Sequence, residues 1–301
     1  MDHQILAAKY KSVLEKVRLV NEPMPQYLNP HLERPLFSRD PYETPLSPNP
    51  PIFQETFKVT HERLEAVDFG PPGWLSNEEI NLLKNVITLR EKAIAFYEEE
   101  RELLKHSYRE PYRIPVIPHE PWQKKPISIP KSILPQFTEL IRERIRTGLY
   151  EQSTSSYTSP TFCVAKSNGK RRIGNDLQEL NKVIIKDAVL TPHIEEFVDA
   201  FAGRASYRLG DIMGGYDVRE LDVTTRPLTT FETPLGRMQL TRLPQGATNS
   251  VAVYQAQMTW IVQEEIPESV EIFIDDGGIK GPRSLYNQEI LLENPSIRRF
   301  I

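Results

Sequence analysis

Four consecutive residues near the C-terminal end, Phe273-Ile274-Asp275-Asp276, constrain the fold of this chain more than any other feature. They follow the apolar run 270–272 and precede Gly277-Gly278-Ile279, so the pattern predicts a strand, a tight turn and a second strand. Because neighbouring carboxylates repel each other, a turn that carries two of them favours a bound cation. A third carboxylate, Asp211, stands 64 residues earlier, after the strand-like run 205–209. Carboxylates fixed at strand ends are what a two-metal phosphoryl-transfer site requires.

The composition predicts a globular part joined to a less compact part. The chain has 301 residues, of which 39% are hydrophobic and 26 are proline, and its net charge is −4. This charge is unevenly distributed, because residues 124–187 hold 12 Lys/Arg against 6 Asp/Glu. The local surplus of positive charge bears on the choice of partner more than the overall charge does.

Cysteine content and hydropathy indicate the compartment. The one cysteine, Cys163, cannot form a disulfide within the chain, which fits a reducing environment. No segment approaches the ~18 unbroken apolar residues of a membrane helix, and the N-terminal residues lack the apolar core of a signal peptide. We therefore expect an intracellular protein, in the cytoplasm, the nucleus or both, with no membrane partner.

The first 75 residues are expected to form an N-terminal helix followed by a proline-rich linker. Apolar residues recur at helical spacing over 3–20, which predicts an amphipathic helix. The stretch 21–60 contains nine prolines, a density that few regular elements tolerate. We interpret this stretch as an extended linker or a wrapping arm.

Residues 76–110 are expected to form a helical connector. The capping box Ser76-Asn77-Glu78-Glu79 predicts where the helix begins. Its apolar face carries Ile80, Leu83, Ile87, Ile94 and Tyr97, so we expect the helix to include these residues and to end before Pro111.

Residues 111–282 combine strand and helix signals, which predicts an α+β fold. The pairs Asn168-Gly169 and Leu235-Gly236 each separate two strand-like runs and indicate hairpins. Helices are predicted from Ser132 to Gly148 and over 193–202 and 249–264. The remaining residues, 283–301, are too few for a further domain.

Six motifs in this region, taken together, resemble the reverse transcriptase of gypsy-type LTR retrotransposons. The match covers roughly residues 112–282. The motifs occur in the order and with the approximate spacing of that family. They are Ser159-Pro160 with 162–166, the segment 168–181 that ends in Leu180-Asn181, Asp211-Ile212 to Tyr216, the hairpin 230–236, Leu243-Pro244-Gln245-Gly246 with 249–255, and the aromatic-x-Asp-Asp box 273–276.

The resemblance implies a polymerase fold: an antiparallel palm sheet backed by helices, with a fingers subdomain in 111–282. It also implies RNA-directed DNA polymerase activity, in which Asp211 and Asp275 are the main ligands of two Mg²⁺ ions, or of Mn²⁺ in their place. Asp276 would support these two catalytic aspartates from the turn. Template–primer, either RNA or DNA, and deoxynucleoside triphosphates are then the expected partners.

The resemblance further implies four nucleotide-binding residues. Lys166 and Arg172 would approach the triphosphate from the fingers, where an arginine fork suits phosphate oxygens. Tyr216 would lie beneath the sugar, where its ring collides with a 2′-hydroxyl and so favours deoxynucleotides. Gln245 would contact the nucleotide or the template, and the basic surplus near the fingers would contact template phosphates.

Reverse transcriptases of this family continue into a thumb, a ribonuclease H domain and an integrase. None of these fits into 283–301, so we expect a truncated tail and missing polyprotein domains. One alternative is a catalytically inactive palm and fingers remnant that retains nucleic-acid binding or only a structural role. Another is an interaction protein in which the proline-rich arm matters most. The carboxylate trio favours the polymerase, whereas the missing thumb favours a remnant.

Overall fold

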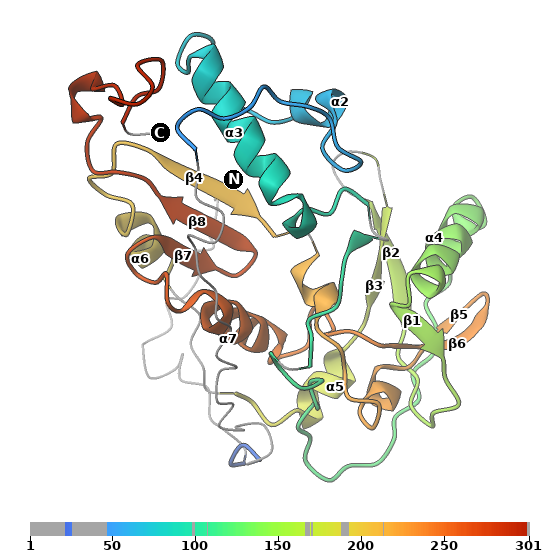
Figure 1. Cartoon of the computed structure of the whole chain (residues 1–301). Helices are drawn as coiled ribbons and strands as arrows, with labels where there is room; N and C mark the ends of the chain where they lie inside the picture. Colours follow the sequence, from blue (N-terminus) through green and yellow to red (C-terminus); the bar gives the residue numbers. More distant parts are fainter. Residues whose placement is uncertain are drawn as a thin grey trace, which may run out of the picture.

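The computed structural model places helices beside antiparallel sheets, which confirms the α+β class (Figure 1). The helix expected over 3–20 lies outside the described residues, as does most of the proline-rich stretch. Only the backbone is described for Asp211. The described residues are 22–25, 47–97, 100–106, 108–165, 169, 171–187, 193–212 and 214–299.

The central sheet has the order β4-β8-β7 and contains both segments that carry the predicted catalytic aspartates. Its strands are β4 (Tyr207–Asp211), β7 (Val270–Phe273) and β8 (Asp276–Lys280), and both pairings are antiparallel. Strands β7 and β8 form the tight hairpin that the sequence predicts. We call this sheet the palm sheet.

Two helices pack against the palm sheet. Helix α7 (Ser250–Val262) contacts β7, and helix α6 (Ile194–Asp199) is followed by Phe201, whose ring lies on Gly278 of β8. A Cβ at position 278 would come within 2.1 Å of that ring, so this close approach requires glycine. Figure 1 shows α6 and α7 beside β7.

The remaining strands form the expected hairpins. Strands β2 (Thr161–Ala165) and β3 (Arg171–Asn175) pair with each other, and β5 (Phe231–Thr233) pairs with β6 (Gly236–Leu240) across the turn that ends at Gly236. Strand β1 (Tyr150–Gln152) adds to the other edge of β6. Helix α4 (Leu134–Arg146) precedes β1. Helix α5 (Gln178–Val183) follows β3, and the 3-10 turns η4 (Gly215–Val218) and η5 (Arg226–Thr229) lie between β4 and β5.

One hydrophobic core joins these elements. Helix α4 ends where the sequence predicts, because Gly148 adopts the left-handed φ of +70° that terminates helices. Its apolar face is buried, as are residues from α5, α7 and the strands around them. The most deeply buried apolar side chains of this core are those of Phe137, Ile141, Leu180, Ile184, Leu221, Phe231, Met238, Leu243 and Tyr254.

The N-terminal connector differs from the sequence-based prediction in its length. The capping box at Ser76 and Glu79 is present and begins α3 (Asn77–Leu89), but the helix ends well before Pro111. It stops at Arg90, whose φ of −113° leaves the helical region, and a 3-10 turn, η2 (Glu91–Ala93), follows. The long helix was therefore a wrong prediction.

Contacts with an earlier segment explain why the helix stops. Glu91 accepts a hydrogen bond of 2.6 Å from the Thr56 hydroxyl, and Lys58 donates to the carbonyl of Ile94 at 3.0 Å. The guanidinium of Arg63, on α2 (His61–Glu65), lies 4.2 Å from the ring centroid of Phe96. These tertiary contacts turn the chain after α3. They outweigh the weak helix propensity of the residues that follow Arg90.

The C-terminal residues pack on α3 rather than extending away. Arg298 pairs with Glu79, and Asn294 donates to the carbonyl of Pro48 at 2.7 Å. Between them and the palm sheet lies the short turn η6 (Tyr286–Gln288). None of the helices in the described part of the chain is long and apolar enough to span a membrane.

Candidate active site

The backbone register of the palm sheet brings the two aspartate segments together. Asp211, the last residue of β4, is directly opposite Asp276, the first residue of β8. The next residue, Ile212, donates its backbone N–H to the carbonyl of Asp275 at 2.8 Å. Directly opposed residues in an antiparallel pair have Cα atoms about 4.5–5.5 Å apart. Segments 64 positions apart in the sequence therefore meet at one end of the sheet, as the carboxylate pattern predicts.

The turn between β7 and β8 has an unusual backbone conformation. Ile274 has a φ of +55°, a left-handed value that β-branched residues rarely adopt. Gln255 of α7 accepts a hydrogen bond of 2.7 Å from the N–H of Ile274. The same amide group donates to the carbonyl of Ile272 at 3.0 Å. Because the Gln255 side chain is buried, these two bonds fix the turn that carries Asp275.

Tyr216 lies close to Asp275 and is buried in the turn η4. Its ring stacks on that of Tyr254, with centroids 4.8 Å apart and planes 22° apart. Burial raises the pKa of the Tyr216 phenol, and the negative charge of Asp275 raises it further. The predicted sugar-contacting residue is therefore positioned beside the predicted metal ligand, on a rigid aromatic support.

A cavity of about 380 Å³ brings together two of the four predicted nucleotide-binding residues. Arg172 comes from β3, and Gln245 comes from the turn before α7. Asn181 holds this turn, since it donates to the carbonyl of Gly246 at 3.0 Å and accepts from the N–H of Thr248 at 2.8 Å. Tyr216 is not among the residues that line the cavity, but its neighbour Asp217 is. Lys166 lies outside the described residues, so its predicted role stays a prediction.

Three charged residues of the cavity wall were not found by sequence reasoning. They are Arg144 of α4, Asp217 of η4 and Arg242, which follows β6. Arg144 lies 3.4 Å from the Asp217 carboxylate. Of these, only Arg144 stands in a sequence pattern, because it alternates with Arg142 and Arg146 along α4.

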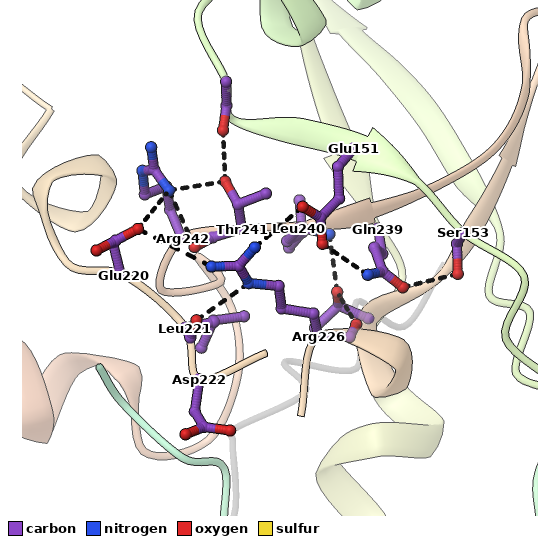
Figure 2. Close-up of polar contacts among 12 residues, drawn as sticks. Glu151, Ser153, Glu220, Leu221, Asp222, Arg226, Gln239, Leu240, Thr241 and Arg242 are labelled. Atoms are coloured by element: carbon purple, nitrogen blue, oxygen red, sulfur yellow. Dashed lines mark hydrogen bonds and ion pairs between the residues drawn. The ribbon is translucent and has the colours of Figure 1, made fainter. Parts of the chain in front are cut away.

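An ion-pair network holds Arg242 at the edge of this cavity. Figure 2 shows Arg226 between Glu151 and Glu220, with Arg242 between Glu220 and Thr241. Arg226 donates to Glu151 at 2.9 Å, and Arg242 lies 3.6 Å from Glu220. Burial lowers the pKa of Arg242, and Glu220 opposes that shift. The network therefore keeps a partly desolvated positive charge beside Gln245.

The carboxylates fit the chemistry of a hard divalent cation, because Mg²⁺ prefers oxygen ligands. Asp275 is half-buried with its Oδ1 atom fully covered, whereas Asp276 is exposed. Among the side chains that the structure describes, no group of three or more His, Cys, Asp and Glu residues could hold a metal ion. The side chain of Asp211 is not among the described ones. Asp211 is therefore placed next to Asp275 and Asp276 by the backbone register alone.

Two curated relatives are Pol polyproteins of Drosophila melanogaster transposons. The chain is 30% identical over 164 residues to the retrovirus-related Pol polyprotein from transposon 412, a match that covers 52% of this chain and 13% of the relative. It is 25% identical over 142 residues to that from transposon gypsy, with 45% and 14% covered. The chain thus spans about one-seventh of the length of these relatives. No protein-family model matches it.

A solved structure with the same fold is the foamy viral protease-reverse transcriptase in complex with an RNA/DNA hybrid. It superposes with a TM-score of 0.63 at 19% identity, and covers 71% of this chain and 28% of that chain. Identity at this level shows the fold alone. The chain is thus similar in sequence to retrovirus-related Pol polyproteins of transposons, and it has part of the fold of a solved reverse transcriptase.

Proposed function

We propose that this chain is the fingers and palm part of an RNA-directed DNA polymerase, which adds deoxynucleotides to a primer on an RNA or DNA template. The observation that carries the proposal is the register of the palm sheet. It places Asp211 opposite Asp276 and bonds Ile212 to Asp275. The similarity to Pol polyproteins and the fold shared with a reverse transcriptase solved on RNA/DNA support the same reaction.

In this proposal Asp211 and Asp275 hold two Mg²⁺ ions, and Asp276 supports them. When bound, the metal supplies charge neutralisation for the attacking hydroxyl and the leaving pyrophosphate. Gln255 orients Asp275 by fixing the turn, and Tyr216 excludes a 2′-hydroxyl beside it. The cavity with Arg172 and Gln245 receives the nucleotide, because its arginines suit phosphate oxygens.

A single-nucleotide primer-extension assay tests this function. The chain is mixed with an RNA template, a labelled DNA primer, the next deoxynucleoside triphosphate and Mg²⁺. We expect addition of one nucleotide by the wild type and a loss of at least about 100-fold in D275N, because the substitution removes a carboxylate ligand of the metal ions whose positive charge stabilises the transition state by several kcal/mol.

The matched control is D199N, which changes an exposed aspartate at the end of α6 and should extend the primer like the wild type. Template–primer binding is measured on the same samples. If the wild type and D275N bind template equally but extend equally poorly, the polymerase proposal is wrong and the inactive remnant takes its place. If neither the wild type nor D275N binds nucleic acid, the polymerase proposal is replaced by the alternative of an interaction protein.

A further inference from the structure

A segment that precedes every polymerase motif runs along the back of the turn η4. Leu104 donates its backbone N–H to the carbonyl of Val218 at 2.9 Å, and His106 lies 2.7 Å from the Glu220 carboxylate. Further on, Tyr112 donates to the carbonyl of Glu220 at 2.8 Å. Residues 104, 106 and 112 therefore hold the part of the chain that follows Tyr216 and Asp217.

Arg101 contacts the start of η4 through its side chain. Its Nη1 atom lies 3.4 Å from the Asp217 carboxylate and 3.5 Å from the carbonyl of Gly214, and its side chain is only 10% exposed. Gly214 has a φ of +58°, and a Cβ there would fall 1.6 Å from Nη1. The guanidinium thus occupies the space that any other residue at position 214 would need.

Two arginines contact the same carboxylate oxygen of Asp217. Arg101 and Arg144, of which Arg144 lines the cavity, each lie 3.4 Å from Oδ2. Asp217 also lines the cavity that contains Arg172 and Gln245. A carboxylate in that position repels a triphosphate unless its charge is compensated. The Arg144 side chain is 39% exposed, so solvent partly screens its charge. The Arg101 side chain is only 10% exposed, so its charge compensates that of Asp217 more strongly.

We propose that Arg101 is a positioning residue for nucleotide binding. It fixes the turn η4 through Gly214 and Asp217, and it neutralises Asp217 so that the cavity accepts a triphosphate. Residues 100–106 then form part of the polymerase unit although no motif includes them. The charge-compensation step rests on the nucleotide-binding function proposed above, whereas the positioning step does not.

Hydrogen exchange tests the positioning step without any nucleotide. The Asp217 amide donates to the carbonyl of Gly214 at 2.8 Å, so its exchange rate reports on the order of η4. We expect R101M to accelerate exchange over 215–218 by about tenfold, as loss of about 1.4 kcal/mol of local stability would do. The palm hairpin 270–280 should be unaffected, and R101K should lie close to the wild type.

The matched control for this measurement is R142M, which removes an arginine whose ion pair with Glu139 is exposed on α4. Exchange in R142M should equal that of the wild type throughout. Equal exchange over 215–218 in R101M and the wild type would overturn the positioning role of Arg101.

Nucleotide affinity tests the compensation step. Titration of the template–primer complex with the next deoxynucleoside triphosphate should give an affinity about tenfold weaker in R101M, the effect of one uncompensated charge several ångströms from the phosphates. The double variant R101M/D217N should recover most of the loss, because it removes the charge that Arg101 neutralises. A loss of fold or stability would not be repaired in this way.

Two other outcomes of the nucleotide titration would refute the compensation step. If R101M weakens nucleotide binding and the double variant R101M/D217N binds no better, Arg101 acts only by holding η4 and the compensation step is wrong. If the wild type binds template–primer but no nucleotide, the proposed function fails together with the compensation step. The exchange experiment still decides whether Arg101 holds η4.

Discussion

At the scale of single residues, Arg219 is a buried arginine whose environment disfavours its charge. It is 8% exposed, and within the described part of the chain its Nε and Nη1 atoms have no hydrogen-bond partner. Burial lowers its pKa to about 10, and the nearby positive charge of Arg109 adds to the shift, while Glu110 opposes it. A charged group that is desolvated without matching hydrogen bonds destabilises the folded state.

We therefore expect R219M to be more stable than the wild type by about 1–3 kcal/mol at pH 7, because methionine fills a similar volume without a charge. Urea unfolding measures this difference, with R142M as the exposed control. A less stable R219M would contradict the account and indicate that the guanidinium is well compensated.

The pH dependence has a definite sign. Above about pH 10 the folded state loses the Arg219 proton, whereas the unfolded chain keeps it up to its ordinary value. The unfolded state then binds more protons, so the stability of the wild type gains relative to R219M as pH rises. The advantage of R219M should accordingly be complete at pH 7 and smaller at pH 11.

At the scale of elements, the carboxylate hairpin depends on a helix that is remote from it in the sequence. The left-handed Ile274 costs on the order of 1–3 kcal/mol, and the two hydrogen bonds from Gln255 of α7 offset that cost. Hairpin and helix thus form one unit, in which α7 determines the conformation of the turn that carries Asp275.

Replacement of Gln255 by leucine should expose this dependence. Q255L leaves the N–H of Ile274 and the carbonyl of Ile272 without their side-chain partner, so we expect a loss of about 2 kcal/mol in urea unfolding. Nucleotide addition should fall further than template–primer binding, because the turn is displaced while the fingers remain. The matched control is Q263L, an exposed site at the end of the same helix. Equal stability of the two variants would show that Gln255 does not hold the turn.

Local signals explain which elements could be predicted from the sequence. The capping box at Ser76, the hairpin turn before Gly236 and the helix end at Gly148 depend on residues next to one another. The end of α3 could not be predicted, since contacts from Thr56 and Lys58 decide it. The helix expected over 3–20 stays a prediction.

The candidate site divides in the same way. Asp275, Arg172 and Gln245 stand in motifs of adjacent residues, and the structure brings the last two to one cavity. The roles proposed for Arg101 and Gln255 arise from contacts between distant elements, which no local pattern encodes. The catalytic and nucleotide-binding roles themselves remain predictions, as does the role of Lys166.

At the scale of the whole molecule, helix α3 near the start of the described chain packs against the residues at its end. Glu79 of α3 is fully buried and accepts hydrogen bonds from the backbone and the guanidinium of Arg298, 219 positions later. A cavity of about 380 Å³ lies between residues 68–75, which precede α3, and the strands β4 and β8 of the palm sheet. Contacts such as that between Arg101 and Asp217 cross the boundary expected at 110–111, which itself stays a prediction.

Figure 1 shows helix α3 beside β4 of the palm sheet, while Gln255 of α7 holds the turn at the end of the sheet that carries Asp211 and Asp275. The proposed reaction depends on those two aspartate segments holding the two metal ions together. Gln255 and Arg101 only hold the turns around them in position.

Binding of Mn²⁺, counted by electron paramagnetic resonance, is the most direct test of that site. With template–primer and the next nucleotide present, the wild type should bind Mn²⁺ that D211N and D275N each lose, while the exposed control D199N binds like the wild type. Mg²⁺ should compete for the same sites. Equal Mn²⁺ binding by the wild type, D211N and D275N would contradict the account.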